Sequence, residues 1–554
     1  MQKSFLFLLI LLYSLSSFSQ WNAGSAINTP VVNAPKSQQN IHMVTDAKQG
    51  AVISWDDNRN SLTSSTDIYA QHLNAGGYAK WAANGVVVCA DSAMQRSSTI
   101  TDAGNGSVII AWEDNRSGNF DIYAQKLDSM GNALWTAGGV VVCNKALAQV
   151  NPKIVNDNAG GAIIVWEDSL NFYWDVYAQR ISSTGTALWT GNGVAVCTAA
   201  NLQINPKVDM DGLGGCIITW QDKRNNSDYD IYAQAFNATG TAQWASNGVV
   251  VCNAINTQSN PRIEPDGANG AVVVWVDKRN GADYDIYAQR IDKTGKVGWK
   301  SNGLVVCSNA ANQSAVDMKY MGAWGLAIAW KDFRGGTFEI YAQLLNLSGV
   351  PLLASNGIKL SAGLQSINPN VVADGTGGAI VVWQDSSSAG WDIKTQKMNS
   401  LGALQWTSGG LAVSTASDDQ INPANASDGN GGAIFAWEDH RNTTDYDIYA
   451  QRLDYTGNVP AGLHEIINAD DLKVICYPNP VTSLSGIQLS NNKNHQNWNI
   501  SIYNSLGETI KNAMVKSEGV YEINVNEFGS GVYFYFIYLA DRSASAKGTL
   551  IFSK

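Results

Sequence analysis

The stretch NPKIVNDNAGGAIIVWEDSLNFYWDVYAQRISSTGTALWTGNGVAVC, residues 151–197, contains four short apolar segments separated by turn signals. Its tryptophan-x-aspartate element recurs every 53 to 57 residues along most of the chain. The eight repeated tryptophans are Trp55, Trp112, Trp166, Trp220, Trp275, Trp330, Trp383 and Trp437. Four strands per repeat are typical of a propeller blade, so the sequence predicts an all-β fold with eight four-stranded blades.

The two ends of the repeated region complete each other. A second tryptophan near the end of the unit is found at Trp81, Trp135, Trp189, Trp244, Trp299 and Trp406. Leu353 replaces it in the sixth copy. The eighth copy has no such residue, whereas the N-terminal segment QWNAGSAINTPVV carries Trp21 in the matching position. Because complementary half-repeats remove the open edge of a sheet ring, we expect a closed eight-bladed propeller whose N-terminal strand completes the last blade.

The pattern divides the chain into four segments. The first residues combine Lys3, an apolar run and small residues before Gln20, as a cleavable signal peptide does. After residue 470 the repeat stops and alternating strands of a small immunoglobulin-like β-sandwich follow. We predict a signal peptide at 1–19, the propeller at 20–463, a linker at 464–474 and the sandwich at 475–554.

Charge and hydrophobicity exclude two classes of partner. The net charge is −11 and the pI is near 5.0, whereas nucleic acid and anionic membranes require a basic surface. The mature sequence contains no run of about 20 apolar residues, which a transmembrane helix requires. We therefore expect no nucleic-acid partner and no transmembrane segment in the mature chain.

Five of the seven cysteines occupy one position of the repeat. They are Cys89, Cys143, Cys197, Cys252 and Cys307. Equivalent positions of adjacent blades lie farther apart than the Cα separation of about 7 Å that a disulfide tolerates. We expect buried packing thiols here. Cys216 and Cys476 lie outside this pattern.

Within each blade the aspartate that follows tryptophan is the most regular charged residue, and an arginine follows it by two residues in six blades. We call each pair a hairpin clamp; the pairs are Asp57 and Arg59, Asp114 and Arg116, Asp222 and Arg224, Asp277 and Arg279, Asp332 and Arg334, and Asp439 and Arg441. A second acid precedes the next strand in every blade, so we expect the arginine to lie between two carboxylates and to hold the hairpin. A metal or acid–base site is disfavoured, because a guanidinium repels cations and the pattern repeats around the ring.

The W-x-D-x-R…D-I-Y hairpin resembles the repeat of TolB-type periplasmic propellers over about half of each blade. The resemblance implies a propeller that serves as a scaffold or docking surface. It implies no specific activity.

Four motifs occur in order after residue 475: Tyr477-Pro478-Asn479-Pro480, Ile502-Tyr503-Asn504-Ser505-Leu506-Gly507, Gly531-Val532-Tyr533-Phe534 and a terminal segment that begins at Lys547-Gly548. Together they resemble the C-terminal sorting domain of the type IX secretion system of Bacteroidota. The resemblance implies that the type IX machinery is a partner and that the protein crosses both membranes. It also implies that the exported protein is either released from the cell or attached to the cell surface.

Ligand contacts are expected on the rim that carries the W-x-D hairpins. An aromatic residue precedes the second acid in blades two to eight: Phe120, Trp174, Tyr229, Tyr284, Phe338, Trp391 and Tyr446. Blades three and seven lack the arginine, so their aromatic side chains are expected to lose a cationic neighbour and to gain exposure. Stacking on sugar rings or a hydrophobic peptide is therefore predicted at Phe172, Tyr173, Trp174 and Trp391.

Catalytic residues, metal ligands and cofactors are not expected, because every prominent acid belongs to the repeat and the five histidines are scattered. The sequence favours an exported binding or adhesion protein whose ligand is a glycan or a protein. Two alternatives remain: a secreted glycan hydrolase or lyase, and a purely structural surface component.

Overall fold

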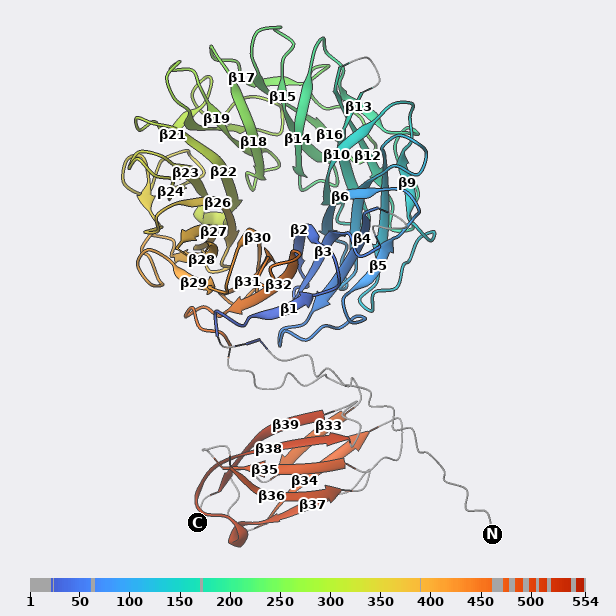
Figure 1. Ribbon diagram of the computed structural model, residues 1–554, viewed down its shortest axis with the longest axis vertical. Helices are drawn as coiled ribbons and strands as arrows, with labels where there is room; N and C mark the ends of the chain where they lie inside the picture. Colours follow the sequence, from blue (N-terminus) through green and yellow to red (C-terminus); the bar gives the residue numbers. More distant parts are fainter. Residues whose placement is uncertain are drawn as a thin grey trace. The chain divides into compact units, whose positions relative to one another are not determined.

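The computed structural model describes most of the repeated region and parts of the C-terminal region. The described residues are 21–22, 24–60, 65–169, 173–388, 390–460, 472–477, 484–491, 498–504, 508–515, 520–539 and 545–552. The predicted signal peptide lies outside them, as does most of the predicted linker, whose last three residues already belong to a strand. The chain forms two compact units, residues 1–461 and 462–554 (Figure 1).

The first unit consists of eight antiparallel four-stranded sheets, as predicted. The first strands of blades one to eight are β2 (Gln38–Thr45), β6 (Gln95–Asp102), β10 (Gln149–Asn156), β14 (Gln203–Met210), β18 (Gln258–Pro265), β22 (Gln313–Tyr320), β26 (Ser366–Ala373) and β30 (Gln420–Ser427). The second strands are β3 (Ala51–Asp57), β7 (Val108–Asp114), β11 (Ala162–Asp168), β15 (Cys216–Asp222), β19 (Ala271–Asp277), β23 (Leu326–Asp332), β27 (Ala379–Ser387) and β31 (Ala433–Asp439).

The third strands are β4 (Asp67–Leu73), β8 (Asp121–Leu127), β12 (Asp175–Ile181), β16 (Asp230–Phe236), β20 (Asp285–Ile291), β24 (Glu339–Leu345), β28 (Gly390–Met398) and β32 (Asp447–Leu453). The outer strands are β5 (Val86–Cys89), β9 (Val140–Cys143), β13 (Val194–Cys197), β17 (Val249–Cys252), β21 (Leu304–Cys307), β25 (Ile358–Lys359), β29 (Leu411–Ser414) and β1 (Thr29–Val32). A short 3-10 turn, η1 (Gly322–Trp324), precedes β23.

The first strands form the inner ring, because each contacts the first strand of the next blade all the way round (Figure 1). Hydrophobic clusters fill the space between neighbouring blades; one joins Ile217 and Ile231 of blade four to Val273 and Trp275 of blade five. The second strands are therefore covered on both faces, and all seven residues of β19 are buried. This burial explains their continuous apolar runs.

The ring is closed by the N-terminal strand. β1 pairs antiparallel with β32, with Thr29 opposite Ala450. The indole Nε1 of Trp21 donates to the carbonyl of Ala75 in blade one at 2.7 Å, the same contact that Trp81 makes to Ser129 of the next blade at 3.1 Å. Blade eight is thus built from both ends of the repeated region.

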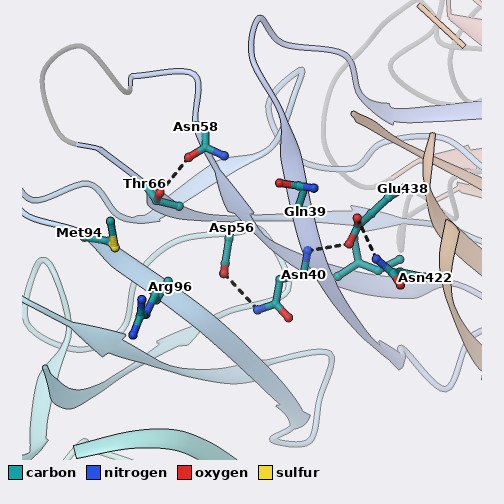
Figure 2. A pocket seen from close by; sticks show the side chains of 10 residues that line it. Gln39, Asn40, Asp56, Asn58, Thr66, Met94, Arg96, Asn422 and Glu438 are labelled. Carbon is teal, nitrogen blue, oxygen red and sulfur yellow. Dashed lines mark hydrogen bonds between the residues drawn. The ribbon is translucent and has the colours of Figure 1, made fainter. Parts of the chain in front are cut away.

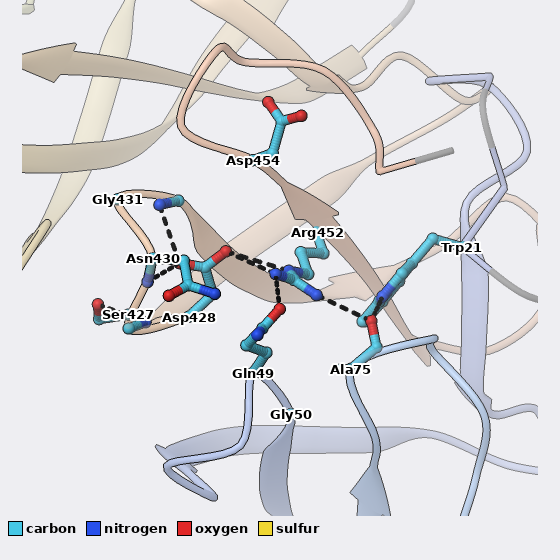
Figure 3. Close-up of polar contacts among 12 residues, drawn as sticks. Trp21, Gln49, Gly50, Ala75, Ser427, Asp428, Asn430, Gly431, Arg452 and Asp454 are labelled. Atoms are coloured by element: carbon cyan, nitrogen blue, oxygen red, sulfur yellow. Dashed lines mark hydrogen bonds and ion pairs between the residues drawn. The ribbon is translucent and has the colours of Figure 1, made fainter. Parts of the chain in front are cut away.

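A charged side chain reinforces this closure (Figure 3). Arg452 of β32 binds Asp428 of its own blade at 2.9 Å and donates to Gln49 at 2.6 Å and to the carbonyl of Ala75 at 3.0 Å, both in blade one. Arg180 of blade three binds its own Asp157 and the next blade in the same way. The closing interface therefore repeats an interior interface of the ring.

The described part of the second unit forms two antiparallel sheets of three and four strands. Their strands are β33 (Leu472–Tyr477), β34 (Leu484–Asn491), β35 (Trp498–Tyr503), β36 (Thr509–Val515), β37 (Val520–Asn524), β38 (Gly531–Leu539) and β39 (Ser545–Phe552), with a 3-10 turn η2 (Val525–Glu527). The sheet orders are β33-β34-β37 and β36-β35-β38-β39. The immunoglobulin-like topology stays a prediction.

Deleting residues 20–32 should leave β32 with an unpaired edge, because β1 is its outer partner. We expect the deletion variant to aggregate or to melt well below the intact protein, as measured by light scattering and circular dichroism.

A transposed variant supplies the matched control. In blade three Trp189 follows Ile181 by eight residues, and inserting residues 21–33 directly after Pro460 places Trp21 at the same distance from Leu453. This variant should fold with near-normal stability. A deletion variant that melts like the intact protein would contradict the role of β1 in closure.

Candidate functional site

The hairpin clamps are most clearly seen in blade five. The buried carboxylate of Asp277 accepts the indole N–H of Trp275 at 2.7 Å and both Nε and Nη2 of Arg279 at 2.9 and 2.5 Å. The same guanidinium lies over the ring of Tyr287 at 3.7 Å and donates to the thiol of Cys252 in blade four at 3.2 Å. The clamp therefore joins two strands of one blade to the outer strand of the preceding blade.

The clamps differ from the expectation at the second acid. The salt bridges of the described residues pair each clamp arginine with the first carboxylate, as they do Arg279 with Asp277. In five of the six clamp blades the second acid accepts an asparagine amide, as Asp285 does from Asn280 at 3.1 Å. In blade six the second acid, Glu339, binds Lys359.

Blades three and seven keep a cation beside the first carboxylate, although they lack the arginine. Lys145 approaches Asp168 at 3.3 Å, and Lys394 binds Asp385 at 2.5 Å. The clamp arginines of the other blades lie over the tyrosine of the third strand, as Arg279 does over Tyr287. The expected exposure of Trp174 and Trp391 through loss of a cationic neighbour therefore stays a prediction.

The five repeated thiols are buried and free, as predicted, and so is that of Cys216. Burial raises the pKa of the Cys252 thiol to about 12, and the other four repeated thiols behave alike. These groups are buried packing residues, and the raised pKa disfavours their thiolate form. The side chain of Cys476 lies outside the described part of the chain.

The predicted aromatic site is not assembled in one place. Tyr173 is 49% exposed, Trp174 and Trp391 are half-buried, and Phe172 lies outside the described residues. Trp174 belongs to blade three and Trp391 to blade seven, and four steps of an eight-blade ring place these blades opposite each other. Tyr173 and Trp174 stay a predicted ligand patch of blade three. Trp391 does not belong to this patch, because it lies in the blade on the opposite side of the ring.

A polar pocket that the sequence analysis missed lies beside blade one (Figure 2). Its volume is about 550 Å³, within the range of small-ligand sites. It is lined by Gln39, Asn40, Ile41, Asp56, Asn58, Thr66, Met94, Arg96, Asn422 and Glu438. Thr66 occupies the position at which every other blade carries an aromatic residue. The small side chain leaves open the space that an aromatic ring fills elsewhere.

Two carboxylates of this pocket share one asparagine. The side-chain amide of Asn40 donates to Asp56 at 3.1 Å, and its backbone N–H donates to Glu438 at 2.8 Å. Asp56 also accepts the backbone N–H groups of Ser97 and Ser98 at 2.7 and 3.2 Å. Asn40 has a φ of 54°, which aims its backbone N–H at the neighbouring blade.

Burial raises the pKa of Asp56 to about 7, against the opposing effect of the N–H donors from Ser97 and Ser98. Burial also raises the pKa of Glu438. On the other side of the pocket Arg96 binds Glu113 at 2.8 Å and keeps 43% of its side chain exposed. The pocket thus offers one carboxyl that changes charge near neutral pH, several amides and an accessible guanidinium.

The inner strands also carry charged residues outside the repeat pattern, contrary to the expectation that every prominent acid belongs to it. Asp209, Glu264 and Asp317 lie on the first strands of blades four, five and six. The sequence carries a signal for Asp209 and Glu264, because most other blades have a small or apolar residue at the same strand position. Asp317 occupies a different position, at which the residue varies from blade to blade.

Among the residues that the structure describes, no group of three or more histidine, cysteine, aspartate or glutamate side chains is placed to hold a metal ion. The described residues also include no helix that is long and apolar enough to cross a membrane.

Residues 475–551 match the family described as the secretion system C-terminal sorting domain. The match supports the predicted type IX sorting domain, and the protein is exported to the cell surface or the extracellular space. No curated protein matches the chain with significant sequence similarity. The resemblance to TolB-type propellers stays a prediction.

Several solved structures are similar to the chain at low identity. PorZ, a surface component of the type IX secretion system of Porphyromonas gingivalis, is 12% identical with a TM-score of 0.34, over 93% of this chain and 70% of PorZ. The polysaccharide lyase Uly1 is 8% identical with a TM-score of 0.42, over 63% and 88% of the two chains. The α-L-arabinofuranosidase Arb93a of Fusarium graminearum is 11% identical with a TM-score of 0.32, over 55% and 92%. Similarities of this size do not identify a ligand.

Replacing Asp277 by alanine should leave Arg279 and the indole of Trp275 without their shared acceptor. We expect a loss of roughly 1–3 kcal/mol in the free energy of unfolding, measured by chemical denaturation. Ligand binding by the folded variant should be unchanged. A variant with unchanged stability and abolished binding would instead assign Asp277 to a functional site.

Proposed function

We propose that the protein is an exported surface or secreted binding protein whose propeller holds a glycan in the pocket beside blade one. Its lining of amides, a hydroxyl, carboxylates and a guanidinium offers both donors and acceptors to sugar hydroxyl groups. The volume of about 550 Å³ suits one or two sugar residues. The Met94 and Ile41 side chains supply apolar surface for the faces of a sugar ring.

The observation that carries this proposal is the departure of blade one from the repeat at Thr66. Seven blades place an aromatic side chain here, and several of these rings are covered by a cation, as Phe120 is by Arg96 at 3.9 Å. In blade one Thr66 cannot make this packing contact, and the polar pocket lies there instead. A repeat protein that departs from its own consensus beside a pocket lined by polar groups has the properties expected of a binding site.

A glycan hydrolase or lyase is the second candidate, because Asp56 and Glu438 lie in the same pocket. With a pKa of about 7, Asp56 is partly protonated at neutral pH and is suited to proton transfer. Paired carboxylates are the groups that glycoside hydrolysis commonly uses. Replacing Asp56 by asparagine separates the two candidates: turnover of a bound glycan would be lost, whereas simple binding would persist.

Replacing Thr66 by tyrosine should fill the pocket without harming the fold, because tyrosine occupies this position in three other blades. We expect glycan affinity to fall by about tenfold or more, since the tyrosine ring would occupy the ligand volume. Glycans are first identified on an array with the purified protein and are then titrated by calorimetry.

Thr66→Ser is the matched control, because it keeps a small hydroxylated side chain, and it should bind like the natural protein. The Tyr173→Ala and Trp174→Ala double variant tests the competing aromatic patch. Reduced binding by the double variant and full binding by Thr66→Tyr would move the site to blade three. Absence of any saturable glycan binding would favour a purely structural surface component.

Removal of the residues after Asp470 should block export at the outer membrane, because the match to the sorting family begins at residue 475. We expect the truncated protein to accumulate in the periplasm of its natural host, as measured by fractionation and immunoblotting. The full chain, expressed from the same promoter, is the control. Truncated protein in the medium at normal yield would contradict the role of the sorting domain.

A further inference from the structure

Three cationic side chains occupy the same position on three consecutive inner strands. Lys153, Lys207 and Arg262 are each the fifth residue of β10, β14 and β18, and we call them the axial cluster. The other five blades carry different residues at this position: His42, Thr99, Asp317, Asn370 and Ala424. A run of three cations in a chain of net charge −11 is therefore specific to blades three to five and is not a property of the repeat.

The lysines of the axial cluster are held in place by neutral acceptors. The ammonium of Lys153 donates to Asn151 Oδ1 at 2.7 Å and to the carbonyl of Pro152 at 2.9 Å. Lys207 donates to Asn205 Oδ1 at 2.7 Å and to the Pro206 carbonyl at 3.3 Å. An ammonium has three N–H donors, so these contacts orient each group and use two of the three.

Blade six neutralises only one edge of the cluster. Asp317 approaches Arg262 at 3.5 Å, and in the adjacent layer Lys319 binds Glu264 at 2.7 Å. Within the described residues, no carboxylate lies within salt-bridge distance of the Lys153 or Lys207 ammonium. Asp209 is two residues beyond Lys207 on the same strand, roughly 7 Å along it. The two lysines are therefore the unneutralised part of the cluster.

The titration behaviour agrees with this geometry. Burial, followed by the positive charges of Arg262 and Lys153, holds the pKa of Lys207 well below its ordinary value, against the effect of Glu167. Burial lowers the pKa of Lys153 to about 8, opposed by Glu167 and Glu113 and reinforced by Arg262. The nearby acids Glu167 and Glu113 therefore do not fully neutralise the positive charges of Lys153 and Lys207. A bound anion would neutralise them.

We propose that Lys153 and Lys207, with Arg262 at their side, form a second binding site, which takes an oxyanion such as a carboxylate, sulfate or phosphate group. The remaining ammonium donors match the acceptor oxygens of such a group, and charge-assisted hydrogen bonds are the strong ones. This site lies on blades three to five and shares no lining residue with the pocket beside blade one. It serves either a free anion or the acidic substituent of a larger ligand.

The test is calorimetric titration of the purified full-length protein with sodium sulfate, sodium acetate, an oligosaccharide of hexuronic acids and a neutral oligosaccharide, at constant ionic strength. The variants are Lys153→Asn and Lys207→Asn, singly and together. Asparagine is tolerated at this position, because blade seven carries Asn370 there. Lys293→Asn removes an equal charge from an exposed turn and is the matched control. Melting temperatures establish that each variant is folded.

We expect saturable binding of at least one anionic probe, weakened about tenfold or more by the double variant and unaffected by Lys293→Asn. Affinity should fall as the pH is raised through about 8, where Lys153 loses its proton. Binding of free sulfate or acetate would identify a site for small anions, and binding of the acidic oligosaccharide alone would identify a subsite for acidic glycans. If no anionic probe binds, or if the double variant binds like the natural protein, the proposal is wrong.

Discussion

One buried carboxylate in each blade connects most of the structure. In blade five Asp277 collects the indole N–H of Trp275 and the guanidinium of Arg279, and that guanidinium reaches the preceding blade. The tryptophan in turn limits what packs on it: a Cβ on Gly303, which has a φ of 89°, would come within 2.5 Å of the Trp275 ring. The turn before the outer strand therefore requires glycine for both its conformation and its lack of a side chain. Hairpin, outer strand and neighbouring blade depend on the same group.

This dependence explains why the clamp survives changes in its members. Blade three has no arginine after Asp168, yet Lys145 lies over the Tyr177 ring at 3.3 Å and approaches the carboxylate. In blade seven the tyrosine itself is replaced by Lys394, which binds Asp385 directly. A carboxylate with no exposed surface needs a cationic partner, because an uncompensated buried charge is strongly destabilising. The blades therefore share a positive charge beside the buried carboxylate, although different residues supply it.

The propeller and its closure could be predicted because they depend on what the blades share: the tryptophan spacing set the blade number, and the unmatched Trp21 placed the last strand. The candidate sites depend on differences between blades. The pocket arises from a missing aromatic at Thr66, whereas the sequence predicted a site at the aromatic residues Tyr173, Trp174 and Trp391. The contact of Asn40 with Glu438 joins residues 398 positions apart. A contact between residues so far apart in the sequence cannot be predicted unless the ring closure is known. The replacement of the aromatic residue by Thr66, in contrast, can be read directly from the repeat.

Closure also gives the inner strands their functional potential. The axial cluster takes one side chain from each inner strand, so a single blade cannot build it. Three adjacent blades can, because the repeat places their fifth residues in the same register. Residues as different as His42, Lys207 and Ala424 occupy that position, so the repeat tolerates substitution there. The architecture therefore separates positions that maintain the ring from positions free to acquire a ligand. Thr66 of blade one and the three cations of blades three to five are substitutions of this kind, and the two proposed sites are built on them.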